Sequence, residues 1–347
     1  MKTAAKPKMT EERLEEIRKT ASETTKEAMA TQEFPRKPSA QGEQSYYGLP
    51  ALKAPVWTWE VPLYFFLGGI AGVSACVAFV AQSFRSDPAL IRVSLWAALL
   101  GAAMCPVLLI ADLGRPTRFL NMLRVFKLRS AMSLGAWILA AFSGFAFLAV
   151  VCFEMLLRGF TNPIWTSLLW LGEASAAAVG LLLASYTAVL IGATAIPVWS
   201  ENRKLLPVHF LTSGLGCSAA ILELAGFLIP ATQILGFAAS GIETLIEIFL
   251  EVRKRPVDAP LHRGKSGTML RIAGLLEGPA ALLLRVFWGS VPAGRYAAAV
   301  CFLIGALLSR YAWIWAGRAS ASDPNILFHL QREAQRTAHS PQTRGHL

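Results

Sequence analysis

Eight long apolar runs constrain this chain more than any other feature of its sequence. Each is about 20 residues long, the length that an α-helix needs to cross the hydrocarbon core of a bilayer. The chain has 347 residues, of which 54% are hydrophobic, and a mean hydropathy of +0.46. We therefore predict an all-α integral membrane protein with eight transmembrane helices. The expected spans are residues 62–82, 92–111, 133–155, 169–195, 206–229, 231–251, 268–288 and 296–316.

The sequence outside and between these spans divides the chain into four parts. Residues 1–55 form a polar extension with a charged helix and an extended lead-in, and they lack the apolar h-region of a signal peptide. The first span itself is therefore expected to direct insertion. Residues 56–200 and 201–318 would each form a four-helix bundle, and residues 319–347 a polar tail.

An internal similarity supports the division into two bundles. The fifth span resembles the first, with Pro62, Tyr64, Phe65 and Gly69 aligned with Pro207, His209, Phe210 and Gly214. This alignment predicts two four-helix repeats in parallel orientation. Chance similarity between two glycine-rich spans is the alternative.

The formal net charge of +11 arises largely from loops between spans. In a soluble protein such a charge would suggest nucleic acid, but basic loops are the usual topology signal of membrane proteins, so we expect no nucleic-acid partner. Most loop Lys and Arg residues lie between spans two and three, four and five, and six and seven. The positive-inside rule then places both termini in the cytoplasm, unless a basic loop is instead a docking surface for an acidic partner.

Several kinds of cofactor and catalytic site lack their ligands here. The five cysteines form no CxxC pair, and only His209 among the five histidines lies in a confident span. We therefore expect no haem, no Fe–S cluster and no metal in this chain. The motifs of ATPases, serine hydrolases and zincins do not occur either.

A short polar stretch, residues 111–119, separates the second and third spans. It places Asp112 and Arg115 three residues apart at the mouth of two membrane helices, between Gly114 and Pro116, which shape the backbone. Asp112 and Arg115 are therefore our candidate catalytic residues. A basic interfacial loop that only fixes topology is the plainer alternative.

Other polar residues gather at the same expected membrane face. Glu60 and Tyr64 are four residues apart and so lie on one side of the first span, and the fourth span carries Tyr186 toward this face. A pocket with an apolar body and a few polar tips suits a quinone, which has a flat ring and two carbonyls. Interfacial anchoring of Glu60 and Tyr64, and a core role for Tyr186, remain the alternatives.

The second half carries its own intramembrane polar residues, which are functional candidates because burying them in lipid is costly. Carboxylates at different depths could form a proton path, or they could pair with Arg271 or Arg285. The group comprises His209, Glu223, Glu243, Glu247 and Glu277.

Four motifs together resemble the NrfD / polysulfide-reductase membrane-subunit family over residues 57–318. They are Leu63-Tyr64-Phe65-Phe66-Leu67-Gly68-Gly69 after Trp59, Asp112-Leu113-Gly114-Arg115-Pro116, Ser130-Ala131-Met132-Ser133-Leu134-Gly135-Ala136-Trp137, and Tyr186-Thr187-Ala188 followed by Ile196-Pro197-Val198-Trp199. The chain departs from the family at two places, because a histidine or asparagine sometimes stands where it has Glu60 and Tyr64, and Ala188 stands where a glycine is frequent.

This resemblance implies a membrane anchor subunit that has no redox cofactor of its own. Such a subunit exchanges electrons between the quinone pool (menaquinone or ubiquinone) and a docked ferredoxin-like 4Fe–4S subunit, often with a further molybdopterin or multihaem catalytic subunit. It would lie in a bacterial inner membrane, with its quinone held in the first bundle by Glu60, Tyr64 and Tyr186. Proton translocation could accompany the electron transfer.

Other functions stay open from the sequence. The two repeats could form a secondary transporter, although Pro62 and Pro207 lie at span starts, where they do not break a helix. The chain could also be a structural anchor with a degenerate pocket, or a conformational proton pump.

Overall fold

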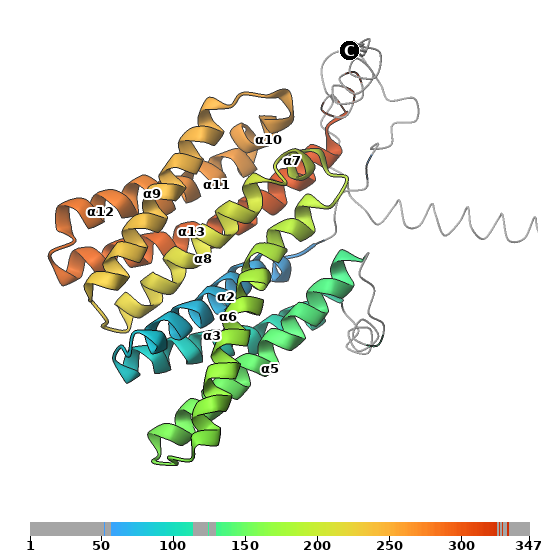
Figure 1. Ribbon diagram of the computed structural model, residues 1–347. Helices are drawn as coiled ribbons and strands as arrows, with labels where there is room; N and C mark the ends of the chain where they lie inside the picture. The colour runs from blue at the N-terminus through green and yellow to red at the C-terminus, as the bar shows by residue number, and fades with distance from the viewer. Residues whose placement is uncertain are drawn as a thin grey trace, which may run out of the picture. The chain divides into compact units, whose positions relative to one another are not determined.

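The computed structural model describes residues 57–113 and 130–324, together with Leu52, Arg124, Ile326, Phe328 and Arg332. Within this part the chain is helical and contains no strand (Figure 1). The long helices are α2 (Glu60–Ser83), α3 (Pro88–Leu113), α5 (Ala131–Leu157), α6 (Pro163–Gly192), α8 (Leu205–Leu224), α9 (Pro230–Val252) and α13 (Pro292–Ser322). The short elements are α7 (Pro197–Glu201), η1 (Pro256–Asp258), α10 (Ala259–His262), α11 (Gly264–Leu275), the π-helical η2 (Leu276–Ala280) and α12 (Ala281–Trp288).

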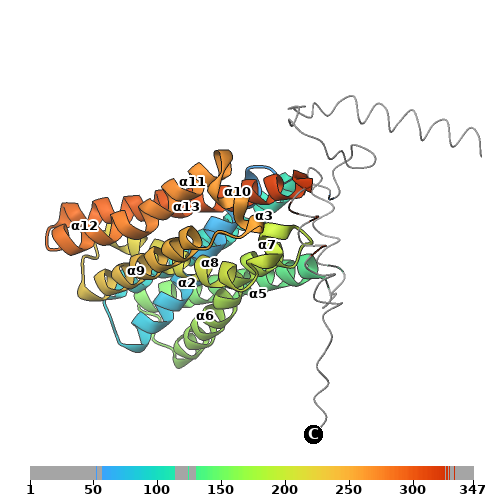
Figure 2. The ribbon, with the colours of Figure 1, turned by 90° about the horizontal axis from the view of Figure 1, so that it is seen from above.

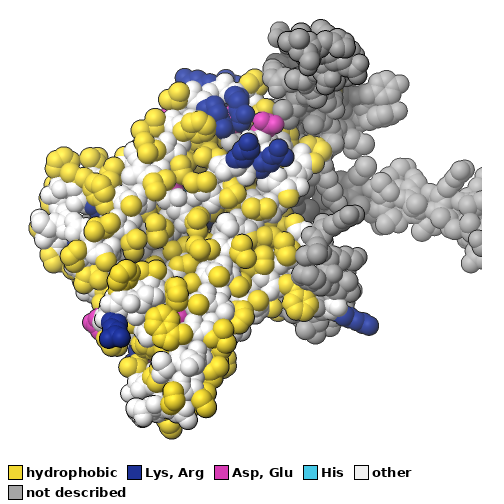
Figure 3. Space-filling view, in the orientation of Figure 1, with side chains coloured by type: hydrophobic (Ala, Val, Ile, Leu, Met, Phe, Trp, Pro, Cys, Tyr) yellow, Lys and Arg dark blue, Asp and Glu magenta, His cyan; other side chains and the backbone are white. Residues whose placement is uncertain are grey.

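Seven helices in the described part are long and apolar enough to cross a membrane, namely the seven long helices given above. Large apolar side chains remain exposed along them, such as Ile234 and Leu245, each 66% exposed, and Figure 3 shows apolar atoms over much of one face. Such a surface is stable against lipid tails but not in water. The chain is therefore a multi-pass membrane protein.

The expected seventh span, residues 268–288, differs from the others. It consists of α11, η2 and α12, which follow one another without a break, and the π-helical segment contains Glu277 and Pro279. A π-turn accommodates a proline that would otherwise clash with the preceding turn.

The helices pack in two groups. In the first, α2 lies between α3 and α6, and α6 also packs against α5. In the second, α8 packs against α9 and α13, and α13 lies alongside α11 and α12, as Figures 1 and 2 show. The groups meet mainly where α8 contacts α2 and α6. Small residues allow close approach, because a Cβ at Gly72 of α2 would overlap the backbone of Gly180 in α6.

Consecutive helices run in opposite directions, so the molecule has two ends. We call the end with the start of α2 and the finish of α3 the Asp112 end, and the opposite one the Arg85 end. At the Asp112 end, Trp199 of α7 is fully buried, and its indole nitrogen donates to the Trp313 carbonyl at 2.8 Å. Trp57 stacks on it with ring centroids 5.4 Å apart. These contacts fix the short α7 against α13 and the start of α2.

Candidate functional site

Two of the predicted carboxylates meet through Thr58 at the Asp112 end. Glu60 is the first residue of α2, and Asp112 lies in the last turn of α3. The Thr58 hydroxyl donates to the Glu60 carboxylate, and the backbone and side chain of Thr58 also hydrogen-bond Asp112. One hydroxyl has a single proton, so it cannot satisfy both carboxylates at once. Thr58 therefore positions an acidic pair that has unused capacity to accept hydrogen bonds.

The two predicted tyrosines also lie close together, one on each of two neighbouring helices. Tyr64 of α2 is 3% exposed and interacts electrostatically with Tyr186 of α6, which is 6% exposed. A Cβ built on Gly68 would lie 3.9 Å from the Tyr64 ring and 4.0 Å from the Thr187 methyl group. The side chains of Tyr64 and of Thr187, the residue after Tyr186, therefore both lie beside Gly68.

The Tyr186 ring is held against the start of α5. Its hydroxyl donates to the Ala131 carbonyl, and a Cβ at Gly135 would overlap the ring. Ser130 caps this helix by accepting a hydrogen bond from the Ser133 amide at 3.4 Å. The absence of a side chain at residue 135 thus sets the position of Tyr186.

Four of the five predicted site residues are therefore placed by the structure, in two adjoining pairs. Glu60 and Tyr64 lie one turn apart on α2 and connect the carboxylate pair with the tyrosine pair. Arg115, the fifth, lies outside the described residues. Two cavities among the described residues, one lined mostly by α2, α8 and α9 and one lined by α3 with residues of α2 and α8, are not lined by any of these four side chains.

The second half contains a buried cluster around His209. Its Nδ1 atom lies 2.7 Å from Glu243 Oε2, and its Nε2 atom lies 2.8 Å from Ser309 Oγ. Ser213 donates to Glu277 at 2.7 Å. One ligand atom each from His209, Glu243 and Glu277 lie within 4.8 Å of one another, a spacing that a metal ion could use.

Arg310 argues against a cation in this cluster. Its guanidinium lies 3.8 Å from the centroid of the Phe210 ring, donates to the Phe210 carbonyl and interacts electrostatically with Glu243 and Glu277. A metal ion would have to share the low-dielectric interior with this positive charge. The His209 cluster, as we call His209, Glu243, Glu277 and Arg310, is therefore better suited to holding protons.

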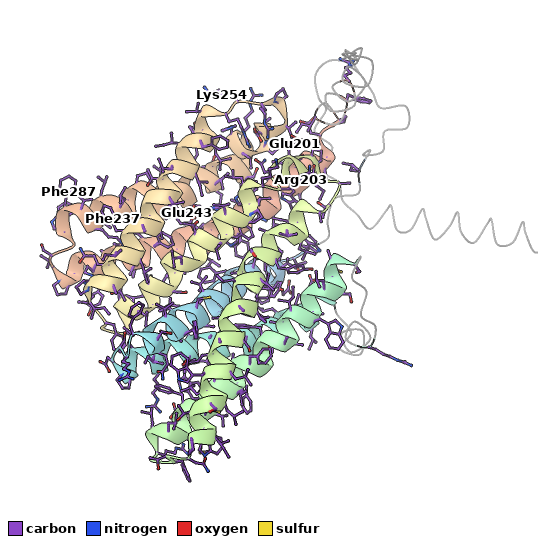
Figure 4. All side chains as sticks on the ribbon, viewed as in Figure 1. Glu201, Arg203, Phe237, Glu243, Lys254 and Phe287 are labelled. Carbon is purple, nitrogen blue, oxygen red and sulfur yellow. The ribbon has the colours of Figure 1, made fainter. Side chains whose placement is uncertain are left out.

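A carboxylate ladder leads from the His209 cluster to the Asp112 end. Glu243, Glu247 and Glu251 follow one another at intervals of four residues on one side of α9. Glu247 interacts electrostatically with Glu243 and Glu251, and exposed Glu251 lies 3.2 Å from Arg271 and 3.4 Å from His262. Figure 4 shows Glu243 between Phe237 and Lys254 along α9.

Glu223, near the finish of α8, serves a different purpose. It accepts hydrogen bonds from Arg285 at 2.8 Å and from Arg295 at 2.8 and 3.0 Å, and Glu223 and the Arg285 side chain are fully buried. The sequence left open a pairing of the second-half carboxylates with Arg271 or Arg285. In the structure, Glu223 forms ion pairs with Arg285 and with Arg295. Arg271 pairs instead with Glu251.

Sequence reasoning missed two polar residues that the structure buries. Glu173 of α6 is fully buried, and neither carboxylate oxygen has a partner among the described residues. A charged residue inside an apolar span was a signal that could have found it. The second, Asp258 in η1, accepts hydrogen bonds from Arg253, Arg255 and Asn202 and ties the end of α7 to the loop after α9. No sequence signal connected these residues.

Asp258 lies outside the membrane-spanning helices. Burial alone would raise its pKa, but the hydrogen bonds and charges of Arg255 and Arg253 outweigh burial and hold the pKa below its usual value. The Asp258 carboxylate is thus charged, and its ion pairs with Arg253 and Arg255 stabilise the loop at the Asp112 end.

The chain was also compared with known proteins. The family model described as polysulphide reductase, NrfD, matches residues 50–318, which is more than half of the chain. No curated protein matches it. Members of the matched family are membrane subunits of quinone-linked oxidoreductases and work with Fe–S and catalytic subunits. Together with the helical membrane fold and the four motifs, this match shows that the chain belongs to the NrfD polysulphide reductase family.

Proposed function

We propose that this chain is the quinone-reactive anchor subunit of a membrane oxidoreductase in a bacterial inner membrane. The observation that carries the proposal is the convergence of Tyr64 and Tyr186 one helical turn from the Glu60–Asp112 pair. The Tyr64 phenol can donate to one quinone carbonyl, and the Tyr186 phenol can donate to the other when it exchanges its hydrogen bond to the Ala131 carbonyl for one to the quinone. The acidic pair can take up or supply protons nearby. The family match favours this function over the secondary transporter.

Different residues of the chain would take different roles in the reaction. Oxidation of one quinol releases two electrons and two protons, and reduction of a quinone consumes the same. Tyr64 or Glu60 would bond one carbonyl and Tyr186 the other, while Asp112 would pass protons to the aqueous face. Arg115 would keep Asp112 ionised or contact the partner. The electrons pass to or from a ferredoxin-like 4Fe–4S subunit, with a molybdopterin or multihaem subunit beyond it.

The basic surface at the Asp112 end is suited to dock that Fe–S subunit. Figure 3 shows Lys and Arg side chains gathered over α7 and the loop after α9, where Figure 4 labels Arg203 and Lys254. The exposed basic residues there are Arg203, Lys204, Lys254, Arg263 and Lys265. The loop from Arg118 to Arg129, which we also expect to dock the partner, lies outside the described residues except for Arg124.

We further infer that the segment from Gly264 to Trp288 crosses the membrane as an eighth helix. At about 1.5 Å per residue it rises by roughly 36 Å, more than the ~30 Å of a bilayer core. With this crossing, each packing group contains four helices, in agreement with the predicted repeat. Both termini would then lie on the side of the Asp112 end, which the loop charges assign to the cytoplasm.

Purification of the full chain in mild detergent tests the main proposal. Mass spectrometry should identify a co-purifying Fe–S subunit, and solvent extraction should recover a quinone. The paired change Tyr64→Phe and Tyr186→Phe should lower the recovered quinone at least tenfold while the Fe–S subunit remains. Tyr296→Phe is the control, because Tyr296 is 36% exposed on α13 and far from this site in sequence and packing. A chain that purifies without quinone and without an Fe–S subunit would overturn the proposal.

Proton transfer through the second half is a second function, favoured by the ladder of Glu243, Glu247 and Glu251. The His209 cluster, buried among α8, α9 and α13, would exchange protons with the aqueous face at Glu251. In proteoliposomes containing the complex, Glu243→Gln should abolish acidification or alkalinisation coupled to quinone turnover and leave turnover in uncoupled vesicles unchanged. Loss of turnover in the uncoupled vesicles would instead assign Glu243 to quinone chemistry or to folding.

A further inference from the structure

An apolar groove lies between the two groups of helices at the Arg85 end. Its volume is about 500 Å³, within the range of roughly 300–1,000 Å³ that is typical of ligand pockets. Residues of α2, α8 and α9 form most of its wall, and Leu181 of α6 and the start of α3 complete it. No residue of the proposed quinone site lines it.

The groove has the length of one membrane leaflet. Its α2 wall runs from Val73 through Val77 and Val80 to Phe84, residues that follow one side of the helix. This stripe rises by roughly 16 Å at about 1.5 Å per residue. Half of a bilayer core of ~30 Å is about 15 Å. The groove therefore extends from the membrane surface at Phe84 to the middle of the bilayer at Val73.

Between the membrane-spanning helices, the polar side chains in the wall have no hydrogen bond to offer a quinone. The Thr212 hydroxyl donates to the Val208 carbonyl at 2.8 Å, and the Thr232 hydroxyl donates to backbone carbonyls of the loop before α9. The Cys76 thiol lies 3.3 Å from the Ala177 carbonyl. Because these donors are already engaged, quinone carbonyls would lose their hydrogen bonds here, whereas a hydrocarbon chain would lose nothing.

Arginine side chains lie on two sides of the surface end of the groove, and the nearby Asp87 carboxylate accepts a hydrogen bond from the Ala89 amide. Phe84 and Ser86 line it, and Arg85 between them is exposed, with a φ of 51° that turns the chain after α2. Within the described residues the Arg85 guanidinium makes no hydrogen bond or ion pair. Behind the opposite wall, Arg295 donates to Thr232 at 2.9 Å, and Glu223 neutralises only one of Arg285 and Arg295. A phosphate at this end would meet two sources of positive potential.

We propose that this groove binds an anionic phospholipid, with one acyl chain between the two helix groups and its phosphate at Arg85. The lipid would fill the gap between α2 and α9 and so stabilise the contact between the groups in one leaflet. The proposal does not depend on the quinone site, which lies at the other end of α2.

Two pairs of matched variants test it. Val80→Trp would fill the groove, and Val107→Trp is its control because Val107 is similarly exposed (57% against 52%) but does not line the groove. Arg85→Glu would repel the phosphate, and its control is Arg158→Glu, an exposed arginine that caps α5 at the same end. The full-length protein is purified in mild detergent, and bound phospholipid is measured by native mass spectrometry.

The expected result is at least a fivefold loss of bound phosphatidylglycerol or cardiolipin for Val80→Trp and Arg85→Glu, with both controls unchanged. Added phosphatidylglycerol, but not phosphatidylcholine, should raise the Tm of the wild type, because a ligand that binds only the folded state stabilises it. The Tm of Arg85→Glu should not respond, which separates loss of the site from misfolding. Equal retention in all four variants, equal response to phosphatidylcholine, or displacement of quinone by Val80→Trp would each overturn the proposal.

Discussion

Phe65 of α2 and Phe210 of α8, which align with each other in the internal sequence similarity, pack together with ring centroids 6.1 Å apart. Gly69 and Gly214 are likewise aligned, and a Cβ on Gly69 would lie 3.9 Å from the Gly214 Cα. Equivalent residues of two repeats meet in this way only near an axis that relates the repeats. The contact between α2 and α8 is therefore where the axis of the predicted repeat would pass.

This close contact predicts the effect of a larger side chain at Gly214. A Cβ there would lie 3.0 Å from the Gly69 carbonyl oxygen and 3.1 Å from Val73, so Gly214→Leu should separate the helices and cost about 1–3 kcal/mol of unfolding free energy. Gly241→Leu is the control, because nothing lies within 4 Å of a Cβ at Gly241. Thermal melting in detergent measures both; equal Tm values would show that the helices tolerate separation.

Gly135→Ala should impair quinone turnover without unfolding the protein. The added methyl group would overlap the Tyr186 ring and displace its hydroxyl, and a misplacement of about 1 Å can cost on the order of 100-fold in rate. We expect at least a tenfold loss. Gly144→Ala on the same helix has open space and should retain wild-type turnover. Unchanged turnover in Gly135→Ala would remove Tyr186 from the proposed site.

Glu223→Gln should be strongly destabilising. Removing one member of a buried ion pair costs about 3–5 kcal/mol, and here two buried guanidinium groups would lose their counter-ion. Glu154→Gln provides the comparison, because its partner Arg92 is 53% exposed and such pairs contribute about 1 kcal/mol or less. The Tm values of the two variants are compared with that of the wild type in the same detergent. Similar losses of Tm in both variants would contradict the prediction that the buried ion pair contributes more than the exposed one.

Acidification should weaken the ion pairs that Asp258 forms with Arg253 and Arg255. Its pKa is held below the usual aspartate value of about 3.9 in the folded protein, so its stabilisation is fully present above that value. The stabilisation is lost as the pH falls through the lower folded pKa. The difference in Tm between wild type and Asp258→Asn should therefore be constant near neutral pH and shrink below about pH 4. A Tm difference between the two proteins that grows on acidification would contradict this prediction.

Cysteine labelling can establish whether Gly264–Trp288 crosses the membrane. Lys265→Cys and Ser290→Cys place exposed thiols at the start of this segment and just after its end. In sealed vesicles, a membrane-impermeant maleimide should label them from opposite sides, and Lys265→Cys should match Lys204→Cys. Labelling of both positions from one side would leave seven crossings.

Seven of the eight expected spans correspond to helices long and apolar enough to cross a membrane, because apolar length is a property of local sequence, but their ends were predicted less accurately. The fifth span was expected to reach residue 229, whereas α8 ends at Leu224, where Gly226 adopts a φ of 96° and closes the helix. The fourth was expected to begin at residue 169, whereas Asn162 caps α6 by accepting from the Ile164 amide at 2.9 Å. Both signals were present in the sequence, but the apolar run continues past them.

The positions of the candidate residues along their helices were predictable to a similar degree. Glu60, Tyr64, Asp112 and Tyr186 fall on faces and at depths that helical periodicity gives. The role of Thr58, and the partners of His209 and Glu223, depend on how separate helices are placed side by side, and no spacing along one helix contains that information. Glu243 is 34 residues from His209 and Ser309 is 100 residues from it, yet both contact its ring.

The π-helical segment has a consequence for the second half. Glu277 contacts Ser213 and Arg285 contacts Glu223, so two side chains eight residues apart both reach α8. An α-turn takes about 3.6 residues and the wider π-turn roughly one residue more, so eight residues complete nearly two full turns here. In a regular helix the second side chain would point about 80° away from the first. The extra residue of the π-turn thus rotates the rest of the helix so that both side chains point to the same side. From that side, the helix supplies a carboxylate to one buried cluster and a guanidinium to another.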